Sequence, residues 1–263
     1  MPIGKCALCL KTRELCDSHL LPAAFYRILD DNEVVVVDKD KTAVLTSAQA
    51  RAHLLCSDCE ARFNRGGEDW VLKNCWRSPK RFLLHSALAT AIPFSDKNGA
   101  RVYKGRQISG IDIEKLTYFG LSVFWRASVC NPHFGRVKRQ HQLRLGPYQD
   151  PLRLYLLGTT RMPKDMVLCV AISAYADELQ NTIIAMPYLS SKQRYHIYQF
   201  AVPGIRFHML CGRMVPEQFK SHCCSARLGY LYVNERIEDG ILKTVRVMVE
   251  QAEPKGKLRS MKS

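Results

Sequence analysis

Several features that would identify common kinds of protein are missing from this sequence. It has no glycine-rich phosphate loop and no G-x-S-x-G run, so nucleotide hydrolysis and a hydrolase triad find no support. No apolar stretch is long enough to span a membrane, and we expect no membrane partner. There is no internal repeat, and the one low-complexity stretch is a basic tail at residues 255–263. The function must therefore be sought in individual side chains and their spacing.

Acidic residues are also in short supply. The chain has 24 Asp and Glu against 39 Lys and Arg, which gives a formal net charge of +15. A field of this sign attracts polyanions and makes their binding strongly dependent on salt, so nucleic acid is the natural partner. Ordinary solvated surfaces explain a basic balance equally well. Charge supports a function found elsewhere in the sequence but does not establish one.

A secretion signal is not apparent, because Lys5, Lys11, Arg13 and Glu14 interrupt the apolar run that such a signal needs. The chain has 11 cysteines, an odd number, and some of them are paired with C-x-x-C spacing. This pattern without an export signal favours metal binding by reduced thiols over disulfides. We expect a soluble, cytoplasmic protein.

Two C-x-x-C pairs, Cys6/Cys9 and Cys56/Cys59, are the most informative feature that is present. Four thiolates offered as two short knuckles match the tetrahedral sulfur site that Zn²⁺ prefers. Each knuckle supplies two ligands locally, so the long segment between them can carry other structure. The spacing predicts a structural Zn²⁺ site.

A second ligand set remains open. Cys16 and His19 follow closely on the first knuckle and would complete a local site of three cysteines and one histidine. That set leaves the second knuckle without partners, which is why we favour four cysteines. Cys130, Cys169 and Cys211 lie in apolar runs and are expected to be core thiols.

The order of these motifs resembles the zinc-supported HNH endonuclease family, whose core is the ββα-metal fold. A histidine follows the first knuckle by ten residues, a proline stands three residues beyond it, and Leu-Leu-Cys-x-x-Cys leads into a helix. More narrowly, the chain is similar to uncharacterised bacterial proteins in which Ser-His-x-x-Pro replaces the Asp-His or His-His of the nucleases. The matching residues, which cover roughly the first 70, are Cys6, Cys9, Ser18–Pro22 and Leu54–Glu60.

The resemblance implies that His19 is the general base, taking a proton from water while one divalent metal polarises the scissile phosphate. Glu60 and Asn64 stand where the family has histidines. Four residues apart, these two share a helix face and offer oxygen ligands that suit Mg²⁺ or Mn²⁺. The resemblance therefore implies a catalytic metal site made by His19, Glu60 and Asn64, separate from the zinc.

The most serious departure from the family is Arg51, which stands at the position of the central Asn. His53 or Asp17 is then left to orient the imidazole. His19 can also be explained as a residue that caps a local turn or bonds a backbone carbonyl. The alternative function is a non-catalytic zinc-binding adaptor for DNA or protein, with a decayed nuclease site.

Basic residues that suit contact with the DNA backbone occur in two groups, although solvated side chains or a charged linker explain them as well. The candidate nucleic-acid-binding residues are Arg51, Arg62, Arg65, Arg136, Lys138 and Arg139.

We predict an α+β fold in which a zinc-bound HNH-like module at residues 1–78 precedes a larger helical and antiparallel β-rich domain at 79–263, because Ser78-Pro79 suits a boundary. Within the larger domain we expect helices over about 80–130 and strands over about 143–250, before the basic tail. The predicted helices are 22–29, one from the second knuckle to residue 62, 68–76 after an interruption at Gly66-Gly67, 80–92 and 113–129. The predicted strands are 33–38, 152–157, 166–175, 182–186, 195–202, 205–211 and 230–233.

Overall fold

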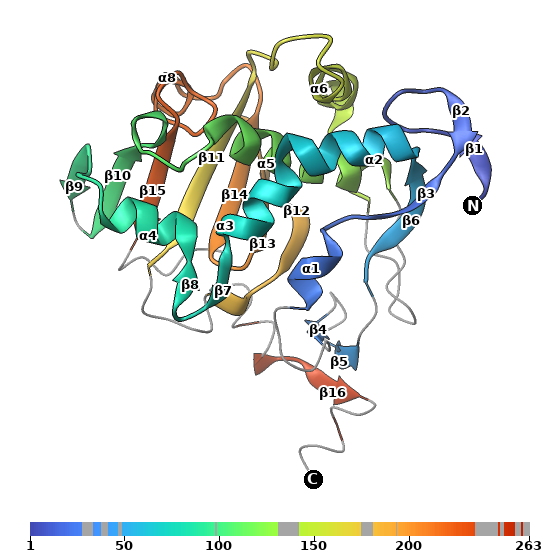
Figure 1. Cartoon of the computed structure of the whole chain (residues 1–263), viewed down its shortest axis with the longest axis horizontal. Coiled ribbons are helices and arrows are strands. Elements are labelled where there is room, and N and C mark those ends of the chain that lie inside the picture. The colour runs from blue at the N-terminus through green and yellow to red at the C-terminus, as the bar shows by residue number, and fades with distance from the viewer. Residues whose placement is uncertain are drawn as a thin grey trace.

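The structure, a computed structural model, describes residues 1–27, 34–37, 42–46, 49–97, 99–130, 142–174, 181–192, 194–234, 247, 250–255 and 259. Figure 1 shows its arrangement. The helices are α1 Ala23–Tyr26, α2 Ser57–Phe63, the π-helix η1 Asn64–Glu68, α3 Asp69–Asn74, α4 Leu83–Ala89, the 3-10 helix η2 Gly105–Gln107, α5 Ile113–Val129, the 3-10 helix η3 Gly146–Tyr148, α6 Gln149–Leu156 and α8 Glu217–Ser221. The strands are β1 Ile3–Lys5, β2 Thr12–Glu14, β3 Cys16–His19, β4 Val34–Val37, β5 Thr42–Thr46, β6 Arg51–Leu55, β7 Trp76–Ser78, β8 Arg81–Phe82, β9 Ser95–Lys97, β10 Ala100–Lys104, β11 Met166–Ser173, β12 Ala185–Lys192, β13 His196–Val202, β14 Ile205–Cys211, β15 Tyr230–Asn234 and β16 Glu253–Lys255.

A seven-stranded sheet forms the largest element, with the strand order β12-β13-β14-β11-β15-β10-β9. Its neighbours are antiparallel except β11 and β15, which run parallel. The long strands β11 and β14 are mostly apolar and buried, which suits strands covered on both faces. The expected mixture of helices and strands is confirmed.

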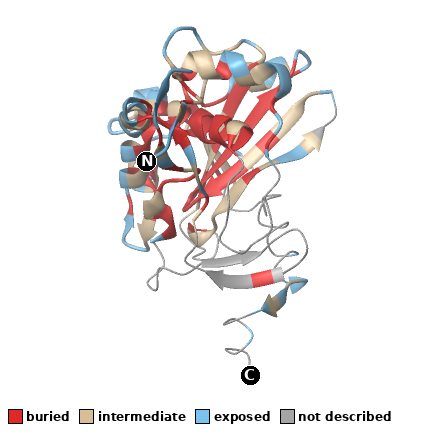
Figure 2. Cartoon of the chain, turned by 90° about the vertical axis from the view of Figure 1, so that its right-hand side faces the viewer, coloured by how far each residue is buried: buried red, intermediate tan, exposed pale blue. Residues whose placement is uncertain are grey.

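Helix α5 crosses one face of this sheet and is buried along most of its length (Figure 2). Phe119 packs edge-on against Phe207 with ring centroids 5.5 Å apart, and Phe124 does the same against Phe200 at 4.9 Å. Such aromatic pairs contribute about 0.5–1.5 kcal/mol each beyond their buried area. The helix predicted over 113–129 is confirmed at these bounds as α5. Its side chains are apolar nearly all round, which is the pattern of a helix buried on several sides.

The segment α2-η1-α3 packs against α5. A Cβ on Gly67 would lie 2.3 Å from the backbone oxygen of Lys115, and one on Gly66 would lie 2.4 Å from the ring of Tyr118. The two glycines therefore bring this backbone against α5. They do not interrupt the helix as predicted; the backbone continues through the π-turn η1.

The N-terminal region places two antiparallel strands before a helix. His19 of β3 lies opposite Arg51 of β6, and β6 leads directly into α2. One hydrophobic cluster continues from this region into the sheet, since it contains Leu8, Phe63 and Leu231. The division at residue 78 stays a prediction.

Several predicted elements of the larger region are wrong. The strand predicted over 152–157 is instead helical, since residues 152–156 belong to α6, where Leu152 and Leu156 are one helical turn apart and bury the same face. The helix predicted over 80–92 is shorter, because Arg81–Phe82 pairs as strand β8 before α4 begins. Strands β9 and β10 lie inside the region expected to be helical, and α6 and α8 lie inside the one expected to be β-rich.

Other expectations need smaller changes. The strand predicted over 182–186 is β12, which begins later and has a bulge before Tyr188. Helix α1 begins near the predicted start, and the rest of the predicted 22–29 helix lies partly outside the described residues. No helix in the described part of the chain is long and apolar enough to cross a membrane.

Candidate metal centre and the histidine beside it

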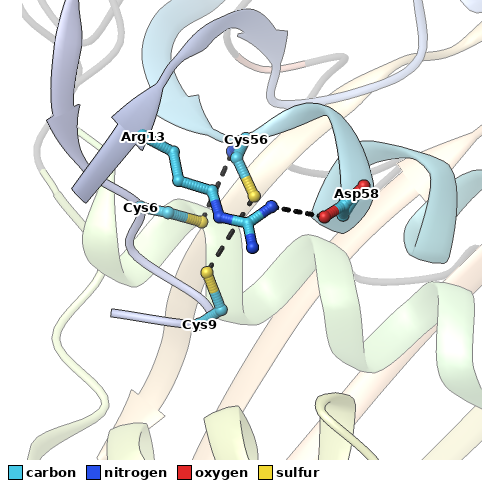
Figure 3. A network of polar contacts seen from close by, with 5 residues as sticks. All are labelled: Cys6, Cys9, Arg13, Cys56 and Asp58. Carbon is cyan, nitrogen blue, oxygen red and sulfur yellow. Dashed lines mark hydrogen bonds and ion pairs between the residues drawn. The ribbon is translucent and has the colours of Figure 1, made fainter. Parts of the chain in front are cut away.

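Four cysteine sulfurs from two distant segments meet at the start of α2, and Figure 3 shows three of them. The Sγ atoms of Cys6, Cys9, Cys56 and Cys59 all lie within 4.8 Å of one another, and those of Cys9 and Cys56 are 3.9 Å apart. Sulfurs placed tetrahedrally about 2.3 Å from zinc would be about 3.8 Å apart. The cluster has the size and the donor atoms to hold a metal ion such as Zn²⁺.

Local backbone geometry presents the first pair of thiols. Leu10 has a left-handed φ of 61°, and its N–H donates to the carbonyl oxygen of Cys6 at 2.9 Å, which closes the knuckle. The N–H of Ala7 donates to the Leu54 carbonyl at 3.0 Å and fastens this knuckle to β6. The second pair is presented by the start of α2, so the two segments are joined by backbone hydrogen bonds as well as by their thiols.

The thiols differ in how readily they ionise. Burial disfavours the thiolate of Cys6, but backbone hydrogen bonds, chiefly from Cys9 and Cys56, outweigh it and lower its pKa to about 7. Burial and the neighbouring Cys56 thiol raise the pKa of Cys59. A divalent cation among the four would favour the thiolate form of each, since metal binding releases thiol protons.

Arg13 lies beside the sulfurs in Figure 3. Its Nη1 is 2.5 Å from Oδ2 of Asp58, and this hydrogen bond is the main reason that the pKa of Arg13 is raised, with Cys56 and Cys9 adding to it. Four thiolates around a divalent ion leave a net negative charge. The guanidinium of Arg13 is therefore placed to offset it.

Cys16 and His19 do not belong to this cluster. Among the described residues, the four cysteines are the one group of three or more cysteine, histidine or acidic side chains whose ligand atoms converge. The local set of three cysteines and one histidine is therefore not assembled, because the ring of His19 is engaged elsewhere.

His19 ends β3 and is half-buried. Its Nε2 lies 2.7 Å from Oε1 of Gln49. With the amide oxygen as acceptor, Nε2 carries the proton and Nδ1 keeps a lone pair. Burial lowers the pKa of His19, and the hydrogen bond that His19 donates to Gln49 opposes this only in part. A lowered pKa favours the neutral imidazole, the form that a general base requires.

Gln49 is a residue that the sequence did not bring to attention. It lies just before β6, two residues ahead of the position where the family's Asn is expected. Arg51 itself points to another partner, since its Nη1 is 3.0 Å from Oδ2 of Asp17. Neither Asp17 nor His53 is seen bonded to the His19 ring. The sequence does contain this amide side chain close to the position where the family has its Asn. Only the fold shows that the Gln49 amide reaches the imidazole of His19.

Glu60 lies on α2, close enough to His19 for its charge to raise the pKa of the imidazole. Its Oε1 is buried, and it has no hydrogen-bond partner among the described residues. Asn64 follows α2 as the first residue of η1, and its side chain is exposed. The charge of Glu60 therefore reaches His19. The backbone N–H of Asn64 donates to the carbonyl oxygen of Glu60, but no side-chain hydrogen bond joins Asn64 to Glu60 or His19 in the described part of the chain.

A buried ion pair lies behind the histidine. Arg126 of α5 is 1% exposed, and its Nη1 donates to the backbone oxygen of His19 at 2.9 Å. Its Nη2 lies 2.5 Å from Oε1 of Glu68, which is 6% exposed and belongs to η1. Burial raises the pKa of Glu68, and the charge of Arg126 opposes the shift. The sequence offered Glu68 as a residue that could reach a metal or open the next helix, but it did not indicate Arg126 as part of the site.

The predicted basic contacts are only partly described. Arg62 and Arg65 are exposed on the α2-η1 segment, and Arg51 is about half exposed beside its acidic partner. The second group, Arg136, Lys138 and Arg139, lies outside the described residues.

Comparisons with protein-family models, with curated proteins and with solved structures found no match for this chain. The function of the chain must therefore be inferred from the cysteine cluster, from His19 and its neighbours, and from the resemblance of the motifs to the HNH family.

Proposed function

We propose that this chain is a zinc-stabilised, HNH-like protein that binds DNA and hydrolyses its phosphodiester bonds with one divalent metal. The observation that carries the proposal is the environment of His19: a half-buried imidazole hydrogen-bonded to Gln49 and within the influence of the charge of Glu60, whose buried carboxylate oxygen has no hydrogen-bond partner among the described residues. Strands β3 and β6 followed by α2 have the order of a ββα module. The free thiols suit a reducing compartment such as the cytoplasm.

In this proposal His19 acts on the water. Nδ1 accepts a proton as the water oxygen attacks phosphorus, and the bond from phosphorus to the leaving sugar oxygen breaks, with that oxygen taking a proton from solvent. With both ring nitrogens of His19 in use, Glu60 and Asn64 would hold Mg²⁺ or Mn²⁺, which would supply charge stabilisation to the phosphate oxygens. The four-cysteine centre holds the scaffold and takes no part in the chemistry.

Exposed arginines support the choice of substrate. Arg62 and Arg65 are exposed on the α2-η1 segment, which also carries Glu60, so a DNA backbone lying across this segment would meet positive charge. The net charge of +15 supplies a general attraction for the same partner.

A nicking assay tests the proposal. Supercoiled plasmid is incubated with the zinc-loaded full chain and Mg²⁺ or Mn²⁺, alongside His19→Ala and the matched control His53→Ala, an exposed histidine on the adjacent strand. The proposal expects nicking by the wild type and the control, and a rate about 10²–10⁴ lower in His19→Ala, the usual contribution of a general base.

The alternative is a zinc-binding adaptor with a decayed site. The ion pair of Arg51 with Asp17, at the position where the family has its Asn, is the observation that favours it. If folded, zinc-loaded protein nicks no plasmid with either metal but still retards DNA in a salt-dependent manner, the adaptor is the better account.

A further inference from the structure

One buried charge pair joins the candidate site to a helix more than 100 residues away in sequence. Arg126 is among the largest fully buried side chains of the described chain, although it is permanently charged. Burying a charged side chain costs solvation free energy, which contacts with its partners must offset. The partners of Arg126 therefore indicate which parts of the fold it connects. Two of its partners are the backbone of the candidate base and the carboxylate of the π-turn.

The guanidinium fork makes these two contacts with different nitrogens. Nη1 bonds the carbonyl oxygen of His19, and Nη2 contacts Glu68 and lies 3.5 Å from the hydroxyl of Ser122. The Arg126 guanidinium also lies over the ring of Phe63, at 5.2 Å from its centroid, so it cannot swing away without opening the core. One rigid group thereby fixes the distance between the end of β3 and the α2-η1 segment.

The π-turn has a part in this arrangement. Gly66 and Gly67 let the backbone of η1 approach α5, and the Glu68 side chain at its end meets Arg126 of that helix. Such π-turns are rare in proteins, and those that occur are often found at functional sites. The helix α2, which leads directly into η1, carries Glu60, so a shift of η1 would also shift the carboxylate whose charge acts on His19.

We propose that Arg126 and Glu68 are the positioning residues of the candidate site, and that their buried pair sets the place of His19 relative to Glu60. The proposal rests on the nuclease function for its consequence in rate, but its geometric part stands without it. Neither residue touches the reacting atoms; both act through the peptide of His19 and through η1.

The test uses a variant that removes both charges. Arg126→Met alone leaves Glu68 unpaired and buried, which is strongly destabilising. Glu68→Leu with Arg126→Met replaces the pair by apolar groups of similar size, an exchange that is often neutral for stability. The matched control is Arg106→Met with Glu114→Leu, which removes an exposed ion pair at the other end of α5. Zinc content and melting temperature establish that each variant is folded.

Two measurements distinguish a positioning role of the Arg126–Glu68 pair from a purely structural one. We expect the imidazole NMR resonances of His19 to move, and plasmid nicking to fall at least tenfold, in the folded double variant but not in the control. Unchanged His19 resonances, or a nicking rate within twofold of wild type, would overturn the positioning role. If the wild type does not nick but the His19 resonances move, the nuclease proposal fails while the geometric role is supported.

Discussion

At the scale of single residues, His19 determines whether the site can act as a base. Burial is the main cause of its lowered pKa, so the folded chain resists a proton that the unfolded chain binds near the ordinary value of about 6.5. The free energy of unfolding should therefore fall as the pH drops from about 6.5 toward the lower folded pKa. A histidine NMR titration measures the pKa, with His19→Gln for assignment. A value above 6.5 would contradict the described environment.

Gln49 should control the same imidazole. Gln49→Glu places a carboxylate against Nε2 and favours the imidazolium, so the pKa of His19 should rise, whereas Gln49→Ala removes a hydrogen bond that raises it and should lower it further. We expect both changes to leave the zinc content unaltered, since Gln49 is not part of the cysteine cluster. Equal pKa values in the two variants would show that the amide does not contact the ring in solution.

At the scale of elements, the π-turn η1 depends on two glycines that face different atoms. Gly67→Ala would place a methyl group against a backbone oxygen, and we expect it to lower stability by about 1–3 kcal/mol, as overpacking does. Gly66→Ala meets the Tyr118 ring instead, so combining it with Tyr118→Ala should recover part of its loss. Thermal or urea unfolding measures both; no loss in Gly67→Ala would show that η1 lies farther from α5.

The sequence predicted well those elements whose hydrophobic pattern is compatible with only one type of secondary structure. Residues 113–129 are too long and too apolar for anything but a buried helix, and residues 166–173 are a long run that suits a buried strand. Residues 152–157 show how a short apolar run can be misassigned. Strands β3 and β6 were missed because their sequences, CDSH and RAHLL, are short and partly polar, and they become strands only by pairing with each other.

The candidate site divides in the same way. The knuckles Cys6/Cys9 and Cys56/Cys59 were visible because ligand spacing is local, and the structure brings them together. Gln49 and Arg126 were not visible, because their contact with His19 depends on which distant segments the fold places side by side.

At the scale of the whole molecule, apolar side chains of the predicted module at residues 1–78 are buried by residues outside it. Phe25 packs against Phe119 with ring centroids 6.1 Å apart, and Phe63 packs against Trp125 at 6.0 Å, so two of its aromatic residues depend on α5. We expect a fragment of residues 1–78 to remain poorly folded even with zinc, because these faces would be exposed. A dispersed NMR spectrum with the full-length His19 resonances would instead show an autonomous module.

The central claim is that a metal centre built by four cysteines from two segments supports the site. Zinc X-ray absorption of the purified full chain tests it most directly. The account predicts about one zinc per chain with four sulfur neighbours at about 2.3 Å, lost in Cys56→Ser and kept in Cys211→Ala, a buried thiol outside the cluster. A mixed shell with a nitrogen ligand that persists in Cys56→Ser, or no bound zinc in folded protein, would contradict it.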